Sequence, residues 1–168
     1  IENFTNKQHL HVGFIYYHDI EMLLELFKKQ FVCLQAAGGL VTNQRNEFFF
    51  FFLLGVYDLH KGKIVPNETA EEPAQREIFE ECGIDHLTIV RPLGSTFHTY
   101  RLNNEAVLKE THWFHMHTTI DQKPTPQASE NIAVARWIDS REMEQFASRT
   151  YESIKEVLSS FRQASEKR

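Results

Sequence analysis

The chain has 168 residues, of which 42% are hydrophobic and 24% charged, and its formal net charge is −5. These values are typical of one globular domain with its own core, and they exclude a chain that is disordered or coiled coil throughout. The acidic balance, without a Lys/Arg cluster, argues against binding of nucleic acid polymers through their phosphates.

The first part of the chain predicts a strand, a helix and two more strands. Residues 11–17 are rich in β-branched and aromatic side chains, as in a strand. Residues 19–31 place apolar side chains at helical spacing. Residues 31–42 predict a strand interrupted at a Gly-Gly pair. The apolar run 48–54, which includes five consecutive phenylalanines, predicts a strand buried on both faces rather than a platform for stacking bases.

The second part alternates in the same way. We expect a helix at residues 69–82, strands at 87–100 and 107–118 joined by a turn at Asn103-Asn104, and a strand at 132–138. Helical segments follow near 140–146 and 150–161. Strands and helices mixed in this order predict an α/β or α+β domain in which helices cover a mixed sheet.

The helix at 69–82 has clear boundary signals. Thr69 and Glu72 have the spacing of a capping box, and Pro73 falls in the first turn, where a missing N–H does least harm. Gly83 is suited to end the helix in the left-handed conformation.

The same helix carries a cluster of carboxylates. At about 100° per residue, Glu77, Glu80 and Glu81 are surface neighbours, and each pair repels by roughly 3 kcal/mol at about 6 Å before screening. Arg76 is the one cation among them. The cluster is either a solvated acidic face or a site for a hard divalent cation such as Mg²⁺. A second arc, which we expect to face the core, contains Ala74, Ile78, Phe79 and Cys82.

A wider pattern decides between the two alternatives. Gly62, five residues, Glu68, seven residues, then residues 76–78 (Arg-Glu-Ile), one residue, Glu80-Glu81, one residue and residues 83–84 (Gly-Ile) resemble the Nudix box at every defined position. Nine accidental matches in so short a chain have a probability well under about one in a million. The chain is therefore identified as resembling the Nudix hydrolase superfamily, and the resemblance favours the metal site.

The resemblance implies the Nudix fold, an α/β/α sandwich with a mixed sheet. We expect a single Nudix domain over residues 1–168, with an N-terminal strand–helix extension at 1–30, the Nudix core at 36–138 and C-terminal helices at 140–168. The extension could complete the substrate pocket or form the contact of a homodimer.

The resemblance also implies the chemistry of the box. In the family, the carboxylates at the positions of Glu77, Glu80 and Glu81 hold divalent cations, Mg²⁺ or Mn²⁺, together with the backbone carbonyl at the position of Gly62. Such cations neutralise a diphosphate, position a water and lower its pKa. The water then attacks one phosphorus in line, and the other phosphate leaves.

Three more residues complete the predicted catalytic set. The resemblance makes Arg76 and Glu68 mainly structural: the arginine orients the catalytic glutamates, and Glu68 bonds back to its own loop. Some members recruit a carboxylate from a loop outside the box as base or extra ligand. Glu130 is our candidate, and an ordinary solvated glutamate is an equally weighted alternative.

Three runs resemble a subset of bacterial Nudix proteins that look like hydrolases of dinucleoside polyphosphates or ADP-ribose. Residues 57–63 (Tyr-Asp-Leu-His-Lys-Gly-Lys) match Trp-Asp-Leu-Pro-Lys-Gly-Lys. Residues 96–100 and 109–114 match Thr-Tyr-His-Thr-Tyr and Lys-x-Thr-x-Trp-Phe. The candidate substrate-binding residues are therefore Tyr57, His98, Tyr100 and Lys109, although His98 and Tyr100 could equally be polar ends of sheet residues.

The chain departs from this subset at three places. Relatives often have arginines where Leu53 and Leu54 stand, so a cation that binds phosphate could be absent. His60 replaces a proline, which we expect to loosen the approach to Gly62. Asn67 replaces a glycine, a mild change because asparagine tolerates positive φ.

Other features add little chemistry. Cys33 and Cys82 are expected to be reduced thiols, with Cys82 a small buried hydrophobe. His115 and His117 would share a strand face, which leaves an adventitious zinc site as a minor alternative. We expect a cytoplasmic protein, because no signal peptide is visible and the longest apolar run is far too short to span a membrane.

Three functions remain open at this point. The leading hypothesis is a metal-dependent hydrolase of a diphosphate bond in a nucleoside diphosphate linked to another moiety. The second is a catalytically weak Nudix domain that binds nucleotides as a sensor or adaptor, which the missing arginines and His60 favour and the intact glutamates oppose. The third, a prenyl diphosphate isomerase, needs a catalytic cysteine, and Cys33 is the only thiol outside the box.

Overall fold

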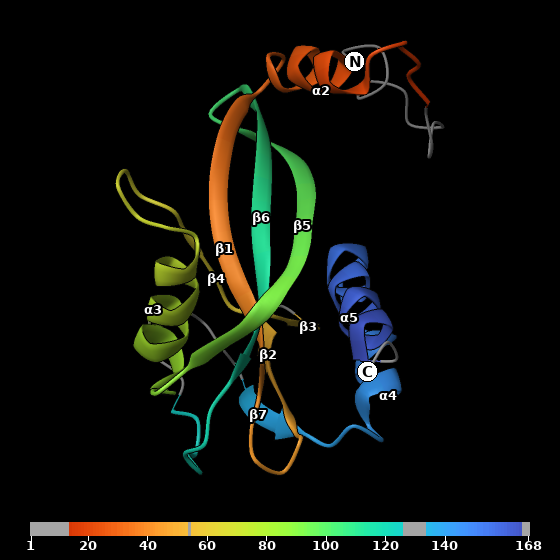
Figure 1. Ribbon diagram of the computed structural model, residues 1–168. Coiled ribbons are helices and arrows are strands. Elements are labelled where there is room, and N and C mark those ends of the chain that lie inside the picture. Colours follow the sequence, from red (N-terminus) through yellow and green to blue (C-terminus); the bar gives the residue numbers. More distant parts are fainter. Residues whose placement is uncertain (1–13, 54, 126–133, 166–168) are drawn as a thin grey trace.

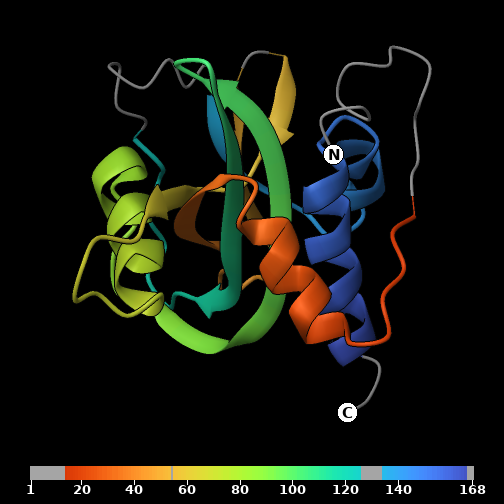
Figure 2. The same ribbon diagram turned by 90° about the horizontal axis from the view of Figure 1, so that it is seen from above.

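The computed structural model describes residues 14–53, 55–125 and 134–165. A mixed sheet lies between α3 on one face and α4 and α5 on the other (Figures 1 and 2). This confirms the predicted layering of helices over a mixed sheet. The strands are β1 (Val32–Thr42), β2 (Phe48–Leu53), β3 (Val56–Asp58), β4 (Lys61–Lys63), β5 (Thr88–Leu102), β6 (Glu105–His117) and β7 (Val134–Ile138). The helices are α2 (Ile20–Lys28), α3 (Glu71–Cys82), α4 (Met143–Ala147) and α5 (Glu152–Ser165).

The centre of the sheet is a parallel pair. β1 runs beside β6 from Val32, opposite Val107, to Thr42, opposite His117, while every other strand pairing is antiparallel. The strands follow the order β3-β2-β1-β6-β5, with β4 paired to β1 and β7 paired to β2. β5 and β6 form a long hairpin whose turn residues Asn103 and Asn104 have φ of 49° and 69°, which confirms the predicted turn.

Each face of the sheet buries its own cluster. The phenylalanine run shows why: Phe48 and Phe50 join the cluster beneath α4 and α5, whereas Phe49 joins the cluster beneath α3. Successive side chains of a strand point to opposite faces, so a strand covered on both sides must be apolar throughout. The prediction that this strand is buried on both faces is confirmed.

The predicted interruption of β1 was wrong, because the strand continues through its glycine pair. A Cβ at Gly38 would lie 2.2 Å from the carbonyl oxygen of His60, and one at Gly39 would lie 2.1 Å from Cε of Met116. The two glycines therefore let neighbouring groups approach the strand closely instead of breaking it.

The N-terminal elements differ in part from the prediction. Residues 14–17 are not in a strand, and the rest of the predicted strand lies outside the described residues. The helix is confirmed as α2, whose N-cap Asp19 accepts 3.0 Å hydrogen bonds from the amides of Glu21 and Met22. None of its residues is buried, and Lys28 ties it to β6 through a 2.8 Å ion pair with Glu110. No helix among the described residues is long and apolar enough to cross a membrane.

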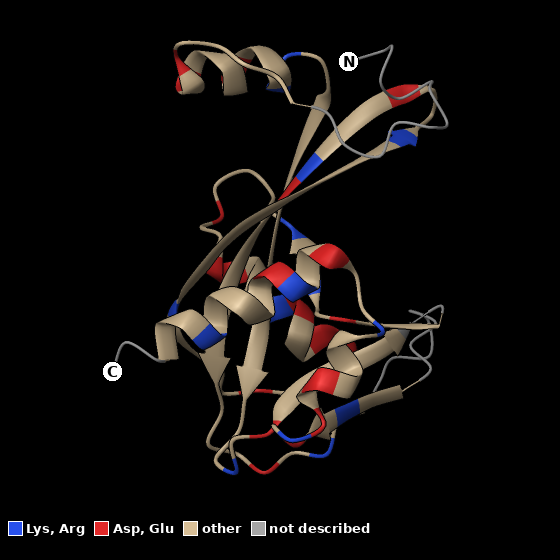
Figure 3. Ribbon diagram, turned by 90° about the vertical axis from the view of Figure 1, so that its right-hand side faces the viewer, with Lys and Arg blue, Asp and Glu red and all other residues tan. Residues whose placement is uncertain are grey.

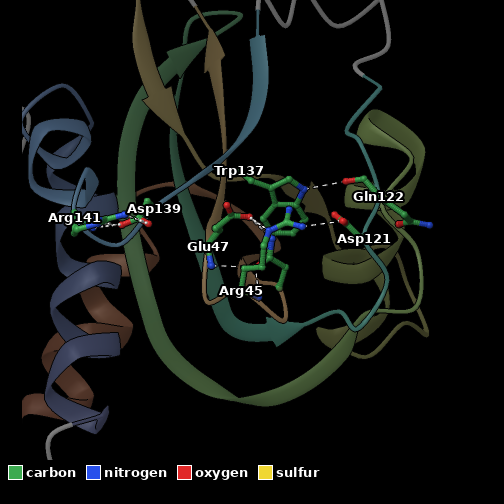
Figure 4. A network of polar contacts seen from close by, with 8 residues as sticks. Arg45, Glu47, Asp121, Gln122, Trp137, Asp139 and Arg141 are labelled. Carbon is green, nitrogen blue, oxygen red and sulfur yellow. Dashed lines mark hydrogen bonds and ion pairs between the residues drawn. The ribbon is translucent and has the colours of Figure 1, made fainter.

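The connection between β1 and β2 is tied to the segment that leads toward β7 (Figure 4). Arg45 contacts Glu47 at 2.9 Å and Asp121 at 2.8 Å, and the indole of Trp137 donates to the carbonyl oxygen of Gln122 at 3.0 Å. Along the ribbon of the described residues, acidic and basic positions are interspersed in this view (Figure 3).

Candidate active site

The acidic helix α3 ends as expected but begins differently. Gly83 has φ of 69°, and its amide donates to the carbonyl oxygen of Phe79 at 2.8 Å, so the left-handed C-terminal residue is confirmed. The helix starts after Ala70, and no side chain caps it. The predicted capping box is only half formed, because Glu72 accepts from the amide of Thr69 at 2.7 Å while the Thr69 hydroxyl turns to the same carboxylate.

The inner face of α3 is fixed by small and branched side chains. Ala74, Ile78 and Cys82 are completely buried and pack on the sheet. Phe79 was wrongly expected in this arc, because its ring is 52% exposed and borders a shallow hollow beside Leu87. These buried side chains fix the orientation of the helix about its own axis. The carboxylates therefore lie at the edge of its buried face.

Gly62 and Glu77 come into close contact across the gap between β4 and α3. A Cβ at Gly62 would lie 2.0 Å from Cγ and 2.1 Å from Cδ of Glu77, so any larger residue there would displace the Glu77 side chain. Gly62 pairs with Ala37 of the central strand, and this pairing sets the position of its backbone. The structure thus places the Gly62 backbone against the first carboxylate of the acidic arc.

Arg76 links the loop before α3 to Glu77. One guanidinium nitrogen lies 2.5 Å from Glu68 and another lies 3.1 Å from Glu77. The second oxygen of Glu68 accepts from the amide of Val65 at 3.0 Å. Asn67, beside it, has φ of 72°, a conformation that asparagine tolerates. The loop, the arginine and the carboxylate therefore form one braced unit.

Glu81 is bound by His60, a residue to which we gave no role. Nδ1 of His60 contacts Oε2 of Glu81, and Nε2 lies 3.0 Å from Sγ of Cys82. His60 is only 2% exposed, with its ring against Phe49 and Phe51. The expectation that this histidine loosens the approach to Gly62 was wrong, because burial and two polar contacts fix it.

Cys82 lies at the buried end of this chain of contacts. Desolvation, with a smaller contribution from the negative charge of Glu81, raises the pKa of its thiol to about 12. This agrees with the expected inert, buried cysteine. Cys33, by contrast, is exposed at the start of β1, and neither thiol is in a disulfide.

The three carboxylates are not gathered at one point. Among the described residues, no group of three His, Cys, Asp or Glu side chains is close enough to hold a metal ion. Glu80 is exposed, while Glu77 and Glu81 are drawn to Arg76 and His60. We expected them to crowd together, but their mutual repulsion and the two nearby donors keep them apart.

The chemistry of the donor set nevertheless fits a hard cation. The Glu77 carboxylate lies against the Gly62 backbone, and Glu80 and Glu81 follow on the same helix. Oxygen is the ligand type that Mg²⁺ and Mn²⁺ prefer.

Lys109 lies within electrostatic reach of this site. Burial lowers the pKa of its ammonium group, the positive charge of Lys61 lowers it further, and Asp58 and Glu77 act in the opposite direction. Lys109 pairs with His98 across β5 and β6, and the ring of His98 stacks on Tyr100 at 5.7 Å. These three sequence candidates therefore share one face of the sheet.

The other candidates are placed apart from this group or not at all. Tyr57 packs its ring against Phe146 of α4 at 4.2 Å. Glu130 and Leu54 lie outside the described residues. Sequence reasoning missed the 2.5 Å ion pair between Asp58 and Lys61, although both residues belong to the run at 57–63.

Comparison with solved structures supports the fold. An Ap4A hydrolase from C. elegans, crystallised as a binary complex, has a TM-score of 0.61 at 17% identity, covering 80% of this chain and 99% of that one. A MutT protein from Methanosarcina mazei Go1 has a TM-score of 0.58 at 16% identity, covering 79% and 95%. A NUDIX hydrolase from Nitrosomonas europaea has a TM-score of 0.59 at 13% identity, covering 79% and 90%.

The family assignment rests on a different match. The family model described as the NUDIX domain matches residues 31–159, which is more than half of the chain and includes β1, α3 and most of α5. The chain therefore belongs to the NUDIX domain family, and with it to the hydrolases that act on phosphorus-containing anhydrides.

Proposed function

We propose that the chain hydrolyses a diphosphate bond in a nucleoside diphosphate linked to another moiety, with ADP-ribose or a dinucleoside polyphosphate as the substrate class. The observation that carries this proposal is the contact of Gly62 with Glu77, braced by Arg76 and Glu68. This contact brings the Gly62 backbone beside a carboxylate, and both groups carry oxygen atoms of the kind that divalent cations bind.

Glu77, Glu80, Glu81 and the carbonyl of Gly62 would hold divalent cations, Mg²⁺ or Mn²⁺. When bound, such cations neutralise the diphosphate and make a bound water nucleophilic near neutral pH. Arg76 keeps the Glu77 carboxylate oriented, and His60 does the same for Glu81. Glu130 stays a candidate for the base or an extra ligand.

Lys109, His98 and Tyr100 would contact the substrate. The ammonium group of Lys109 offers charge to a phosphate, and the stacked rings of His98 and Tyr100 offer a flat surface to a base. Tyr57 stays in the proposed set as a more distant contact. The Ap4A hydrolase among the similar structures is consistent with a dinucleotide, and the MutT protein shares only the fold.

A substrate panel tests the proposal. ADP-ribose, diadenosine polyphosphates, nucleotide sugars and nucleoside triphosphates are incubated with the chain and Mg²⁺, and the released phosphates are quantified. Glu80→Gln should lower turnover by more than the roughly 10–100-fold that is typical for the loss of an outer-shell partner. Glu71→Gln, an exposed carboxylate on the same helix, is the matched control and should keep full turnover. No turnover on any substrate would contradict the proposal.

One observation favours a second candidate function, a domain that binds nucleotides without cutting them. Among the described residues, no three acidic, histidine or cysteine side chains lie close enough together to hold a metal ion. In that case the panel would give binding by calorimetry with no product, and Glu80→Gln would leave the affinity for the nucleotide unchanged.

A further inference from the structure

A continuous run of aromatic rings, with an arginine at each end, joins the sheet to α4. The ring centroids of Phe146 and Tyr57 are 4.2 Å apart, and those of Tyr57 and Phe52 are 4.8 Å apart. The guanidinium carbon of Arg136 lies 4.7 Å from the ring centroid of Phe146. That of Arg149 lies 5.6 Å from the centroid of Phe52 and 5.9 Å from that of Tyr57. We call these five residues the arginine–aromatic cluster.

The backbone holds Arg149 beside Tyr57. The carbonyl oxygen of Arg149 accepts a 2.9 Å hydrogen bond from the amide of Tyr57, and the amide of Arg149 donates to the carbonyl oxygen of Phe146 at 2.9 Å. The next residue, Thr150, forms a bridge with Tyr57, and its hydroxyl donates to the carbonyl oxygen of Tyr57 at 2.6 Å. The main chain that carries the Arg149 side chain is therefore fixed to β3.

The two arginines of the cluster have no carboxylate beside them. Within the described part of the chain, neither guanidinium group forms an ion pair or a hydrogen bond. Arg45 and Arg141, by contrast, pair with Asp121 and Asp139 at 2.8 and 2.9 Å. The whole chain has 23 acidic against 18 basic side chains, so a lack of carboxylates is not the reason. The cluster is a local positive patch on an acidic protein.

A guanidinium group that lies over a ring keeps its hydrogen-bond donors for another partner. The ring attracts the flat face of the cation, whereas the five N–H groups of an arginine point outward in the plane of the group. Both side chains are exposed, so a ligand can reach them. The planar fork matches two oxygens of one phosphate, whose negative charge the patch lacks. Aromatic faces also suit a nucleobase. The cluster therefore fits a phosphate group that is carried by a nucleotide.

The cluster lies on the same face of the sheet as Lys109. Phe52 and Tyr57 pair across β2 and β3, and Tyr57 packs against the buried cluster beneath α4 and α5. Trp113 belongs to that buried cluster. Lys109 precedes it by an even number of residues on β6, so both side chains point to the same face. The ammonium group of Lys109 and the two guanidinium groups therefore face the same side of the sheet.

We propose that Arg149, together with Arg136, binds a phosphate group in the half of the substrate that is not attacked. This inference deepens the proposed function and rests on it. A dinucleoside tetraphosphate has further phosphate groups beyond the diphosphate bond that is cut, whereas ADP-ribose has none. The arginine–aromatic cluster therefore makes this chain select substrates with longer polyphosphate chains.

Binding to the cluster can be observed without metal or turnover. ADP is the probe, titrated in the presence of EDTA while ¹H–¹⁵N spectra follow the Nε–H signals of the arginine side chains. The Arg149 signal is assigned from its absence in Arg149→Met, which keeps contact with the rings and removes the charge. We expect this signal to shift on addition of ADP, and Arg149→Met to weaken ADP binding by roughly 10-fold or more.

The control is Arg141→Met, which removes the same charge from an exposed arginine that is already paired with Asp139. It should bind ADP within about twofold of the wild type. Thermal unfolding of both variants checks that neither substitution disturbs the fold. An Arg149 signal that ADP does not move would overturn the inference, as would an ADP affinity no lower in Arg149→Met than in Arg141→Met.

Steady-state kinetics show whether the bound phosphate belongs to the substrate. Arg149→Met should raise KM for diadenosine tetraphosphate by roughly 10-fold and leave KM for ADP-ribose within about twofold. The kcat values should not change, because a contact made equally in the ground and transition states affects KM alone. ADP binding that depends on Arg149 without this difference in KM would mean a separate nucleotide site, and would overturn the assignment to the substrate.

The two proposals can fail separately. No turnover on the substrate panel, with ADP binding that depends on Arg149, refutes the hydrolase and keeps a nucleotide phosphate at the cluster. Turnover that depends on Glu80, with an Arg149→Met variant that handles ADP and diadenosine tetraphosphate like the wild type, does the reverse. Cleavage of ADP-ribose without cleavage of diadenosine tetraphosphate overturns the inference alone.

Discussion

Gly62 shows how one missing methyl group can position a neighbouring side chain. Its backbone meets the Glu77 side chain so closely that any Cβ would overlap Cγ and Cδ. The carboxylate is also held by Arg76, so it cannot retreat without breaking the 3.1 Å contact. At the scale of a residue, Gly62 and Arg76 together confine Glu77 to a narrow range of positions.

We therefore predict that Gly62→Ala lowers kcat/KM by about 100-fold, since a displacement of about 1 Å at a reacting group can cost that much. The measurement is steady-state turnover on the preferred substrate of the panel. Lys63→Ala alters the next, exposed residue of the same strand and should leave kcat/KM within about twofold. Equal activities in the two variants would show that the contact is not used.

Lys109 provides a test of charge at the substrate face. Burial, and then the nearby Lys61, hold its pKa below the unfolded value, so the unfolded chain binds more protons in the pH range between the two values. The contribution of Lys109 to the free energy of unfolding therefore rises with pH through that range. At pH 7 the energetic cost of burying the charged ammonium group is fully present. Lys109→Met should stabilise the fold at pH 7 by about 1 kcal/mol or less, and the gain should shrink as pH approaches about 10.

Urea unfolding at the two pH values measures this gain, and the exposed Lys63→Met is the comparison that should show none. The same Lys109→Met variant should raise KM for a phosphate-bearing substrate. If Lys109→Met destabilised the fold at pH 7, the favourable contacts of Lys109 with nearby negative charges would outweigh the cost of burying its ammonium group.

At this scale the sequence predicted some contacts better than others. The box residues were found because their spacing along the sequence, mostly on one helix, identifies them without knowledge of the fold. The bond from His60 to Glu81 joins residues 21 positions apart in different elements, and no local period reports it. The replacement of a proline by a histidine was the one visible signal, and it was interpreted as loosening because burial could not be seen.

The boundaries of elements depend on backbone conformation as much as on pattern. Gly83 ends α3 at φ of 69° with open space around its Cα, so an added methyl group would meet no atom. A substitution there tests the conformation alone. We predict that Gly83→Ala lowers the free energy of unfolding by about 1 kcal/mol, and Gly83→Asn by clearly less, because asparagine tolerates the left-handed region.

Urea titration followed by circular dichroism gives both values. Because α3 is held up to Cys82 by the packing of its buried side chains on the sheet, neither variant should change the KM for substrate by more than about twofold. Equal stability of the alanine and asparagine variants would contradict the conformational argument.

Helices and strands with a clear hydrophobic periodicity were predicted, and the shortest strands were not. The β5–β6 hairpin follows from two apolar strands around Asn103-Asn104, but β3 and β4 have three residues each, too few to show a period. They form only because β2 and β1 offer edges to pair with. The Gly-Gly pair in β1 was mispredicted for a related reason. In the sequence, two glycines indicate a break in the strand, whereas in the fold they allow neighbouring groups to approach the strand closely.

At the scale of the whole molecule, the layered sandwich could be predicted because strands buried on both faces need a helix on each side. The placement of α2 could not. It carries an apolar stripe but buries no residue, and its one described ion pair with the sheet joins Lys28 to Glu110. Nothing in its sequence indicates which part of the fold it would approach.

A whole-molecule prediction concerns metal and stability. A cation that binds the native but not the unfolded chain stabilises it by about 2.7 kcal/mol at one hundred times its Kd. For a domain of this size this corresponds to a rise in Tm of about 5–10 °C. Thermal unfolding with Mn²⁺ and with EDTA measures it. Glu80→Gln should lose most of the rise in Tm, and Glu71→Gln should keep it. A wild-type Tm that does not change on addition of Mn²⁺ would contradict the metal assignment.

The two tryptophans give this molecule a built-in optical reporter. Trp113 is sealed in the core and donates to Thr96, so its emission should respond to unfolding alone. Trp137 is half-buried, 5.3 Å from Phe49, and Phe49 in turn stacks on His60. Replacing Trp113 by phenylalanine would leave Trp137, labelled in Figure 4, as the single tryptophan. Since only the ring of Phe49 separates it from His60, its emission could follow changes around Glu81 in real time without any attached dye.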